Sequence, residues 1–520
     1  MDHAKLKPAT HDLEIGCSTH MANRMIGSSM LTRWLTLMAV AAAVTTGTSV
    51  AGGQSATRER ATTSSARCRG VVVKLSTNLQ RAVAVHRPGT VFCIVTGVHR
   101  LRTYVVPKDG DQFIGMPGAV LNGSVLLTRF TRSGSDWAMK LEVPANPVLA
   151  GTCIADRGDT CQYANDVYFD NRPLRRVAAL GALARNSFYV DSASNTLYLR
   201  RDPTAHQVEM AVATRAFKGW GTGVENVTIR ALDVEKFANE YGIAAINGRP
   251  TWSVLDCTVR LNHGTGIQDA SLIKGNFIAD NGQLGVAGSF TNGARVEYNT
   301  IEGNNYAGFD PGDEAGGGKW VKSKNLLVSH NVVRGNVGPG LWTDGDSINV
   351  VYADNLVVGN TGPGIFHEIS YHATIKGNIV KGNGEAASGW LDGAGILLNS
   401  SGNVEITDNV VSGNRNGIGI TQTDRGTGLY GAYVAQNDYV HDNTVTMLVG
   451  HTGLITSMDD ASYFTSRNNR FVGNHYFLGC GKDYFAWLGP PDQGGYVTWS
   501  QWRAAGNDSG TTVTSICHNP

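Results

Sequence analysis

The chain has 520 residues, of which 42% are hydrophobic, 17% are charged and 64 are glycine. The low charge and high glycine content argue against a coiled coil or a long helical bundle, and the apolar content is too high for global disorder. The 44 Lys and Arg residues are balanced by 43 Asp and Glu residues, so there is no basic excess to bind nucleic acid through its phosphates.

The first 51 residues are typical of a start-site extension followed by a signal peptide. Arg33 precedes an apolar run over residues 34–44, which is too short to span a membrane comfortably, and a small-residue cleavage pattern ends at Ala51. We expect the mature protein to be secreted and to have no membrane association; the alternative is that the segment stays uncleaved as a membrane anchor. Residues 52–69 are rich in Ser, Thr, Ala and Arg and should form a flexible linker.

The next two regions have different local patterns. A short helix is expected over residues 78–86, before a β-prone stretch. From residue 128 onward, segments such as NSFYVDSASNTLYLRRDP alternate between apolar and polar residues, and their SASN sequence is typical of a turn. This pattern predicts antiparallel strands.

A repeat of about 23 residues begins near Cys257. Each unit contains an asparagine, two mostly β-prone residues, two others and a second asparagine, which is too short for a βαβ crossover and suits one coil of a parallel β-solenoid. An asparagine amide can bond to the same residue one coil along, and Cys257 takes this position in the first clear coil. The first asparagines of successive units are Asn276, Asn299, Asn331, Asn355, Asn378 and Asn409.

This repeat resembles that of the right-handed parallel β-helix proteins of the pectin-lyase-like superfamily, over most of residues 70–480. The resemblance implies an all-β fold: a single-stranded right-handed parallel β-helix solenoid with a small antiparallel β insert near the N-terminus. We expect a cap and the first coils over residues 70–127, the insert over 128–215, coils with the active-site face over 216–480, and a C-terminal cap over 481–520. Caps are required because an open solenoid end exposes unpaired strand edges.

The C-terminal cap is expected to be aromatic. Trp487, Trp499 and Trp502 suit a cover over the last coil better than a platform for sugars.

Seven cysteines follow the predicted signal peptide, and an oxidising compartment would favour closing those that lie near one another in sequence. We predict the disulfides Cys68–Cys93, Cys153–Cys161 and Cys480–Cys517, with buried thiols as the alternative, because spacing alone does not fix connectivity. Cys257 is left over and is predicted to be a structural free thiol.

One face of the solenoid is expected to carry acids in three consecutive coils. Aligning the glycine after each second asparagine places Asp310, Asp344 and Glu368 on one outward row. Asp344 and Glu368 share a register in adjacent coils, so we expect their carboxyl groups about 5 Å apart, as in retaining glycosidases. Asp310 would instead form a wider, inverting pair with Glu368. Stacked acids push their pKa values apart, so the three are candidate catalytic residues; a solvated acidic patch and a Ca²⁺ site are the alternatives.

Further candidates surround these acids. Trp342 and Phe366 lie on the same row and offer apolar faces to sugar rings. Glu314 and Lys319, in a glycine-rich segment, and Asp346 are expected to wall the cleft.

His367 is included as a residue that binds substrate or orients a neighbour, although strand alternation should point it away from Glu368. His367, Glu368 and His372 do not form an H-E-x-x-H zinc motif, because the second histidine comes one residue late and the segment is a strand. No metal ligands are therefore predicted. The His-Glu-Ile-Ser segment, together with the Glu-Ala-Gly-Gly and Lys pattern of the glycine-rich segment, resembles a group of secreted, carbohydrate-associated β-helix proteins.

The sequence therefore predicts a secreted, monomeric glycoside hydrolase that acts on a polysaccharide without a cofactor. The insert resembles that of some β-helical glycoside hydrolases. One alternative is a polysaccharide lyase or epimerase, in which Asp310, Asp313, Asp344 and Asp346 hold Ca²⁺ against a uronate and Lys319 abstracts a proton. The other is a non-catalytic glycan-binding solenoid, because the fold alone does not establish catalysis.

Overall fold

The computed structural model describes residues 68–142, 151–387, 390–487 and 495–517. The predicted signal peptide and most of the predicted linker lie outside these residues. None of the helices in the described part of the chain is long and apolar enough to cross a membrane.

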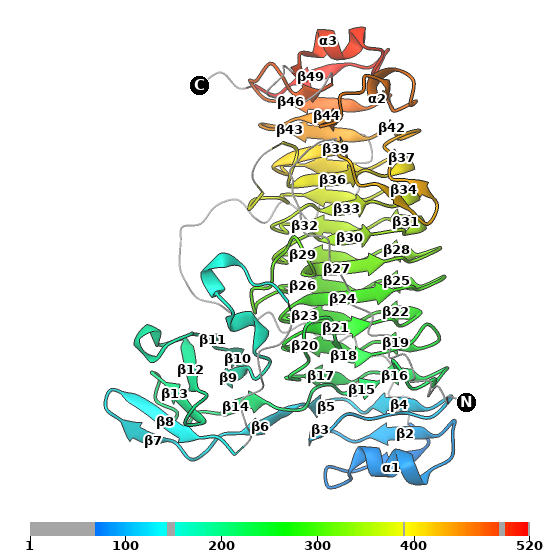
Figure 1. The fold of residues 1–520 in the computed structure, drawn as a ribbon. Helices are drawn as coiled ribbons and strands as arrows, with labels where there is room; N and C mark the ends of the chain where they lie inside the picture. The colour runs from blue at the N-terminus through cyan, green and yellow to red at the C-terminus, as the bar shows by residue number, and fades with distance from the viewer. Residues whose placement is uncertain (1–67, 143–150, 388–389, 488–494, 518–520) are drawn as a thin grey trace, which may run out of the picture.

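The chain winds into a solenoid whose coils each contribute one strand to three long sheets, which we call sheets A, B and C (Figure 1). All neighbouring strands in the three sheets pair in parallel, except β47 and β48 at the C-terminal end. The predicted parallel β-solenoid is confirmed.

Sheet A contains, in stacking order, β15 (Phe217–Lys218), β18 (Ala244–Asn247), β21 (Thr265–Gln268), β24 (Leu284–Ser289), β27 (Gly316–Val321), β30 (Leu341–Asp344), β33 (Ile365–Glu368), β36 (Ala394–Asn399), β39 (Asn416–Gln422), β44 (Thr452–Thr456), β47 (Phe485–Ala486) and β48 (Tyr496–Val497). Sheet B contains β1 (Val71–Val73), β2 (Val91–Ile94), β4 (Gln112–Gly115), β16 (Thr228–Arg230), β19 (Ser253–Leu255), β22 (Leu272–Lys274), β25 (Arg295–Glu297), β28 (Leu327–Ser329), β31 (Ile348–Ala353), β34 (Tyr371–Lys376), β37 (Gly402–Thr407), β42 (Tyr439–His441) and β45 (Arg470–Val472). Sheet C contains β3 (Gly97–Arg100), β5 (Ala119–Asn122), β17 (Asp233–Glu235), β20 (Thr258–Arg260), β23 (Phe277–Ala279), β26 (Thr300–Glu302), β29 (Val332–Arg334), β32 (Leu356–Val358), β35 (Ile379–Lys381), β38 (Val410–Ser412), β43 (Thr444–Met447), β46 (His475–Leu478) and β49 (Val513–Ser515).

Short strands suit this architecture because each needs only one or two inward side chains. The middle residue of a typical three-residue strand is fully buried, as Ile301 is in β26 and Val357 is in β32. Such residues stack along the solenoid axis into one continuous apolar core. Burial of these apolar side chains, repeated in every coil, is the main favourable contribution to the free energy of stacking one coil on the next.

Buried asparagines form the predicted ladder between coils. Asn355 is 1% exposed, and its Oδ1 accepts from the main-chain N and the Nδ2 of Asn331, both at 3.0 Å. Its own Nδ2 donates to Val328 O at 2.9 Å and to Asn378 Oδ1 at 2.9 Å. Cys257 is a free, buried thiol whose main-chain N donates to Asn276 Oδ1, as predicted for the first position of the ladder. A second ladder runs through Asn281, Asn304, Asn336, Asn360, Asn383 and Asn414.

Both ends of the solenoid are capped. The helix predicted at the N-terminal end is α1 (Leu79–Val85), whose N-cap Asn78 accepts from the main-chain N of Arg81. At the C-terminal end, α3 (Trp499–Ala504) buries Trp502, which donates to Asp508 at 3.0 Å. Trp487 is also buried, in agreement with an aromatic cap.

The region after β5 leaves the solenoid and forms two small sheets that project from its N-terminal half (Figure 1). Most of their strand pairs are antiparallel, and the SASN turn joins β12 to β13. The strands are β6 (Ser124–Leu126), β7 (Thr131–Ser133), β8 (Asp136–Lys140), β9 (Val167–Phe169), β10 (Arg172–Pro173), β11 (Arg175–Arg176), β12 (Ser187–Asp191), β13 (Thr196–Leu199) and β14 (Val208–Ala211).

Three disulfides join Cys68 to Cys93, Cys153 to Cys161 and Cys480 to Cys517, as predicted.

We predict that Asn355→Ala lowers the free energy of unfolding by about 3 kcal/mol, because the buried main-chain N of Asn331 loses its acceptor and each unsatisfied buried group costs about 1–3 kcal/mol. Urea denaturation followed by circular dichroism measures the change. Asn292→Ala is the matched control, because Asn292 is exposed and its Oδ1 accepts from Asn325 Nδ2 at the surface; the change should alter the free energy of unfolding by less than about 0.5 kcal/mol. Equal effects of the two changes would contradict the ladder's role.

Candidate active site

The register of sheet A decides which side chains meet on the outer face of the solenoid. Lys319 pairs with Trp342, which pairs with Phe366, so these three residues form one outward column. Asp344 and Glu368 end β30 and β33, each one residue beyond the paired Thr343 and His367. The two acids therefore occupy the same position in adjacent coils, as predicted.

The predicted register of Asp310 is wrong. After Phe309 the chain remains outside sheet A until Gly316, the first residue of β27. In β27, Gly318 and not Phe309 pairs with Val286 and takes the inward position. Asp310 lies in this excursion, and its main-chain N donates to Thr152 of the insert at 2.8 Å. The pairing argument that placed Asp310 with Glu368 no longer holds.

Lys319 is a buried cation at the centre of the site, with 2% of its side chain exposed. Its Nζ lies 2.9 Å from Asp344 Oδ2 and 3.1 Å from Glu314 Oε1, and it donates to Asp313 O at 2.7 Å. Burial disfavours the charge of Lys319, but the carboxylates of Asp344 and Glu314 outweigh burial and raise its pKa above the ordinary value. Lys319 is therefore protonated at neutral pH.

Trp342 is not an exposed sugar platform. It is 3% exposed, because Lys319 Nζ lies 3.6 Å from the centre of its ring and Phe366 stacks beside it at 5.4 Å. The prediction of direct sugar contact was therefore wrong for Trp342, whose ring supports the Lys319 ammonium instead. Phe366 is partly exposed and remains available at the surface.

Glu368 is paired with a cation from another part of the chain. Arg425 Nη1 donates to Glu368 Oε1 at 2.7 Å, and the two side chains are 20% and 13% exposed. Burial and the neighbouring charge of Asp344 raise the pKa of Glu368, against the opposing effect of Arg425. Each carboxylate of the pair thus has its own cation, Lys319 for Asp344 and Arg425 for Glu368.

Arg425 belongs to residues 423–434, which leave the solenoid after β39 and which we call the arm. The arm contains a small hairpin, β40 (Thr427–Gly428) and β41 (Gly431–Ala432). Sequence reasoning missed Arg425, although the 34-residue interval between Asn409 and Asn443 shows that an extra segment lies between these coils.

Asp346 lies beneath the arm and not on an open wall of the cleft. It is 7% exposed, and its Oδ1 accepts from the main-chain N of Leu429 at 2.7 Å and from Tyr433 Oη at 2.8 Å. The predicted contact of Asp346 with substrate is therefore replaced by a contact with the chain itself.

Glu314 lies beside Lys319, as its place in the glycine-rich segment suggested, and its side chain is 23% exposed. Burial raises its pKa, with Lys319 acting in the opposite direction. Gln283 Nε2 donates to Glu314 O at 2.7 Å, and Tyr241 Oη donates to Asp313 Oδ2 at 2.7 Å. These bonds hold the excursion against the preceding coils.

His367 lies inside the solenoid and is fully buried, so the prediction that it contacts substrate was wrong. Its Nδ1 lies 2.7 Å from Thr343 Oγ1. Burial lowers the pKa of His367 to about 3, so the ring is neutral in the folded protein.

Three of the four aspartates proposed as Ca²⁺ ligands face different partners. Asp344 faces Lys319, Asp346 faces the arm and Asp313 faces Tyr241. Among the residues that the structure describes, no group of three or more His, Cys, Asp or Glu side chains is arranged to hold a metal ion.

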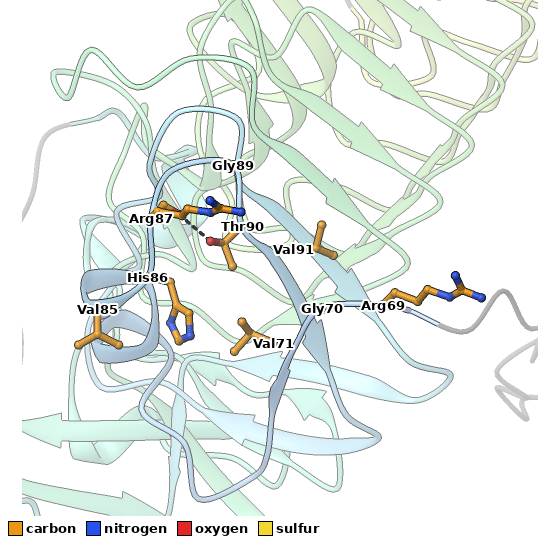
Figure 2. Close-up of a pocket in the computed structure, with 9 residues that line it drawn as sticks. All are labelled: Arg69, Gly70, Val71, Val85, His86, Arg87, Gly89, Thr90 and Val91. Carbon is orange, nitrogen blue, oxygen red and sulfur yellow. Dashed lines mark hydrogen bonds between the residues drawn. The ribbon is translucent and has the colours of Figure 1, made fainter.

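A separate pocket of about 600 Å³ lies at the N-terminal cap (Figure 2). It lies between β1, the end of α1 and the start of β2, and Thr90 Oγ1 donates to Arg87 O at 2.6 Å on its wall. Its lining contains no carboxylate. It therefore lacks the acid pair that distinguishes the face of sheet A.

Comparison with known proteins finds a family model and solved structures that this chain resembles. A family model described as "Right handed beta helix region" matches residues 241–394. A solved structure described as XylC in complex with xylose is 15% identical, with a TM-score of 0.59 over 85% of this chain and 83% of that chain. The A-module of the Azotobacter vinelandii mannuronan C-5 epimerase AlgE6 is 13% identical, with a TM-score of 0.44 over 85% of this chain and 93% of that chain. No curated protein sequence matches the chain.

We predict that buried His367 makes the protein less stable as the pH falls below about 6.5. The unfolded chain binds a proton at the ordinary histidine pKa, whereas the folded chain does not until about pH 3, so stability is lost across this window. His367→Leu removes this dependence, and Leu398 occupies the same position in the next coil.

Urea denaturation measures the free energy of unfolding at pH 7 and at pH 5. Between these pH values, wild type should lose about 2 kcal/mol more of this free energy than His367→Leu does. The same pH dependence in both proteins would show that His367 is protonated as easily in the folded state as in the unfolded one.

Proposed function

We propose that this right-handed parallel β-helix protein is a glycoside hydrolase that cleaves a polysaccharide with Asp344 and Glu368. The observation that carries the proposal is the placement of these two acids at one position of adjacent coils, each beside its own cation. Strands in a sheet lie about 4.8 Å apart, which suits the separation of about 5–5.5 Å between the carboxyl groups of retaining enzymes.

The environments of the two acids give them different roles. Glu368, whose pKa is raised, donates a proton to the glycosidic oxygen as the bond to the anomeric carbon breaks. Asp344, which lies 2.9 Å from Lys319 Nζ, attacks the anomeric carbon as that bond breaks and forms a covalent intermediate. Glu368, now ionised, takes a proton from water, and the hydroxyl adds to the anomeric carbon as Asp344 leaves.

The partly exposed Phe366 provides an apolar surface beside the acids for a sugar ring. The XylC structure is described as a complex with xylose, which supports a carbohydrate ligand for this chain through the shared fold alone. The three disulfides support the further proposal that the protein acts in an oxidising compartment outside the cell.

A Ca²⁺-dependent lyase or epimerase is less well supported. That reaction needs Lys319 as a base, but the raised pKa of Lys319 keeps its proton in place under two carboxylates. It also needs aspartates that converge on an ion, whereas Asp313, Asp344 and Asp346 face different partners.

The mature protein, incubated with neutral and uronate-rich polysaccharides with and without a chelator, should release oligosaccharides that have gained water, whether or not the chelator is present. Mass spectrometry of the products measures this. Asp344→Asn and Glu368→Gln should each lower turnover by about 10²–10⁴-fold or more. The first change removes the nucleophile, and the second removes the general acid and base.

Asp354→Asn and Glu405→Gln are matched controls on exposed acids elsewhere on the solenoid, and both should retain full activity. Unsaturated, ultraviolet-absorbing products that disappear with the chelator would instead identify a lyase. Binding of a polysaccharide without any product, unchanged in Asp344→Asn, would identify a glycan-binding solenoid.

A further inference from the structure

We propose that Arg425 is a positioning residue for Glu368, and that the arm holds it in place. This inference rests on the proposed function, because it concerns how one member of the carboxylate pair is controlled. It goes beyond the acid pair by assigning a task to a segment that is not part of the solenoid.

The arm is fixed to the solenoid at its base. Gln422, at the end of β39, is 2% exposed, and its Nε2 donates to Tyr433 O at 3.1 Å. Its Oε1 accepts from the main-chain N of Ala435 at 2.7 Å. One buried amide thus joins the start of the arm to its end.

The hairpin of the arm is fixed a second time. Asp346 accepts from Leu429 N and Tyr433 Oη, and Tyr371 Oη donates to Gly431 O at 2.7 Å. A Cβ atom added at Gly428 would lie 2.1 Å from Asp346 Oδ1, so only glycine permits this close approach. Contacts at two separate points thus hold the arm against the solenoid.

This anchoring matters because Arg425 contacts only one oxygen of Glu368. Its Nη1 donates to Oε1, and no other described residue donates to Oε2. The guanidinium therefore orients the carboxyl group and leaves its second oxygen for the glycosidic bond.

Arg425 is also the cation in direct contact with Glu368. The charged groups that act on Glu368 are Asp344 from β30, Lys319 from β27 and Arg425 from the arm, while Asn399 from β36 is neutral. Lys319 already contacts Asp344 and Glu314. Without Arg425, Glu368 would face Asp344 with no cation of its own.

The pH dependence of turnover tests this role. Loss of Arg425 raises the pKa of Glu368 further, and a general acid loses activity as the pH rises through its pKa. In Arg425→Met, the basic limb of the pH profile should therefore move to higher pH by about one unit or more, with turnover lowered about tenfold at the optimum because the carboxyl group is less well oriented. In Arg425→Lys, the basic limb should lie between its positions in wild type and in Arg425→Met.

Gly428→Ala and Tyr433→Phe test the anchoring, because both loosen the arm without changing a group that touches Glu368. Both should shift the basic limb in the same direction as Arg425→Met. Arg129→Met is the matched control: Arg129 is 81% exposed on the insert, so its loss should leave the profile unchanged. A basic limb that stays in place in Arg425→Met, Gly428→Ala and Tyr433→Phe would overturn the proposal while leaving the hydrolase intact.

A double-mutant cycle tests the contact without relying on activity. Arg425→Met should lower the urea midpoint of wild type at pH 8 but have little effect in a Glu368→Gln background. An equal shift in both backgrounds would overturn the pairing of Arg425 with Glu368. A folded wild type that hydrolyses no polysaccharide would refute the proposed function, and the cycle would still decide whether Arg425 pairs with Glu368.

Discussion

The parallel register between coils is the constraint on which the rest of this structure depends. Because strands in adjacent coils lie about 4.8 Å apart, a residue at a given position meets the residue at the same position one coil along. Buried asparagines such as Asn355 fix this register by bonding to the coils on both sides. This register also explains the site. Thr343 pairs with His367, 24 residues further along the chain, and this pairing brings the residues that follow them, Asp344 and Glu368, close together.

Two acids at this spacing repel each other, and the protein offsets the repulsion with cations from opposite sides. Lys319 comes from the preceding coil and is almost completely buried, whereas Arg425 comes from the arm and is partly exposed. The two acids therefore have different surroundings despite their equivalent positions. The proposed mechanism uses this asymmetry to give the two carboxyl groups different roles.

Much of the fold and part of the site could be predicted from sequence, for identifiable reasons. The ladder at Asn355 and the free thiol of Cys257 followed from a strict repeat, and the positions of Asp344 and Glu368 followed from counting along it. Asp310 was misplaced because Gly308 and Phe309 match the glycine and apolar residue that mark a strand of sheet A in other coils, whereas the strand of this coil begins only at Gly316. Arg425 was missed because the repeat shows that a segment leaves the solenoid there but not which residues that segment returns to the face of the solenoid.

The proposed mechanism requires a glycan to bind across Asp344 and Glu368 on the face of sheet A. A crystal structure of Glu368→Gln with an oligosaccharide released by wild type would show where the sugar binds. We expect a glycosidic oxygen within about 3 Å of the residue 368 side chain, with Asp344 below the anomeric carbon of the same sugar. A sugar bound elsewhere on the solenoid, with neither residue in contact, would contradict it.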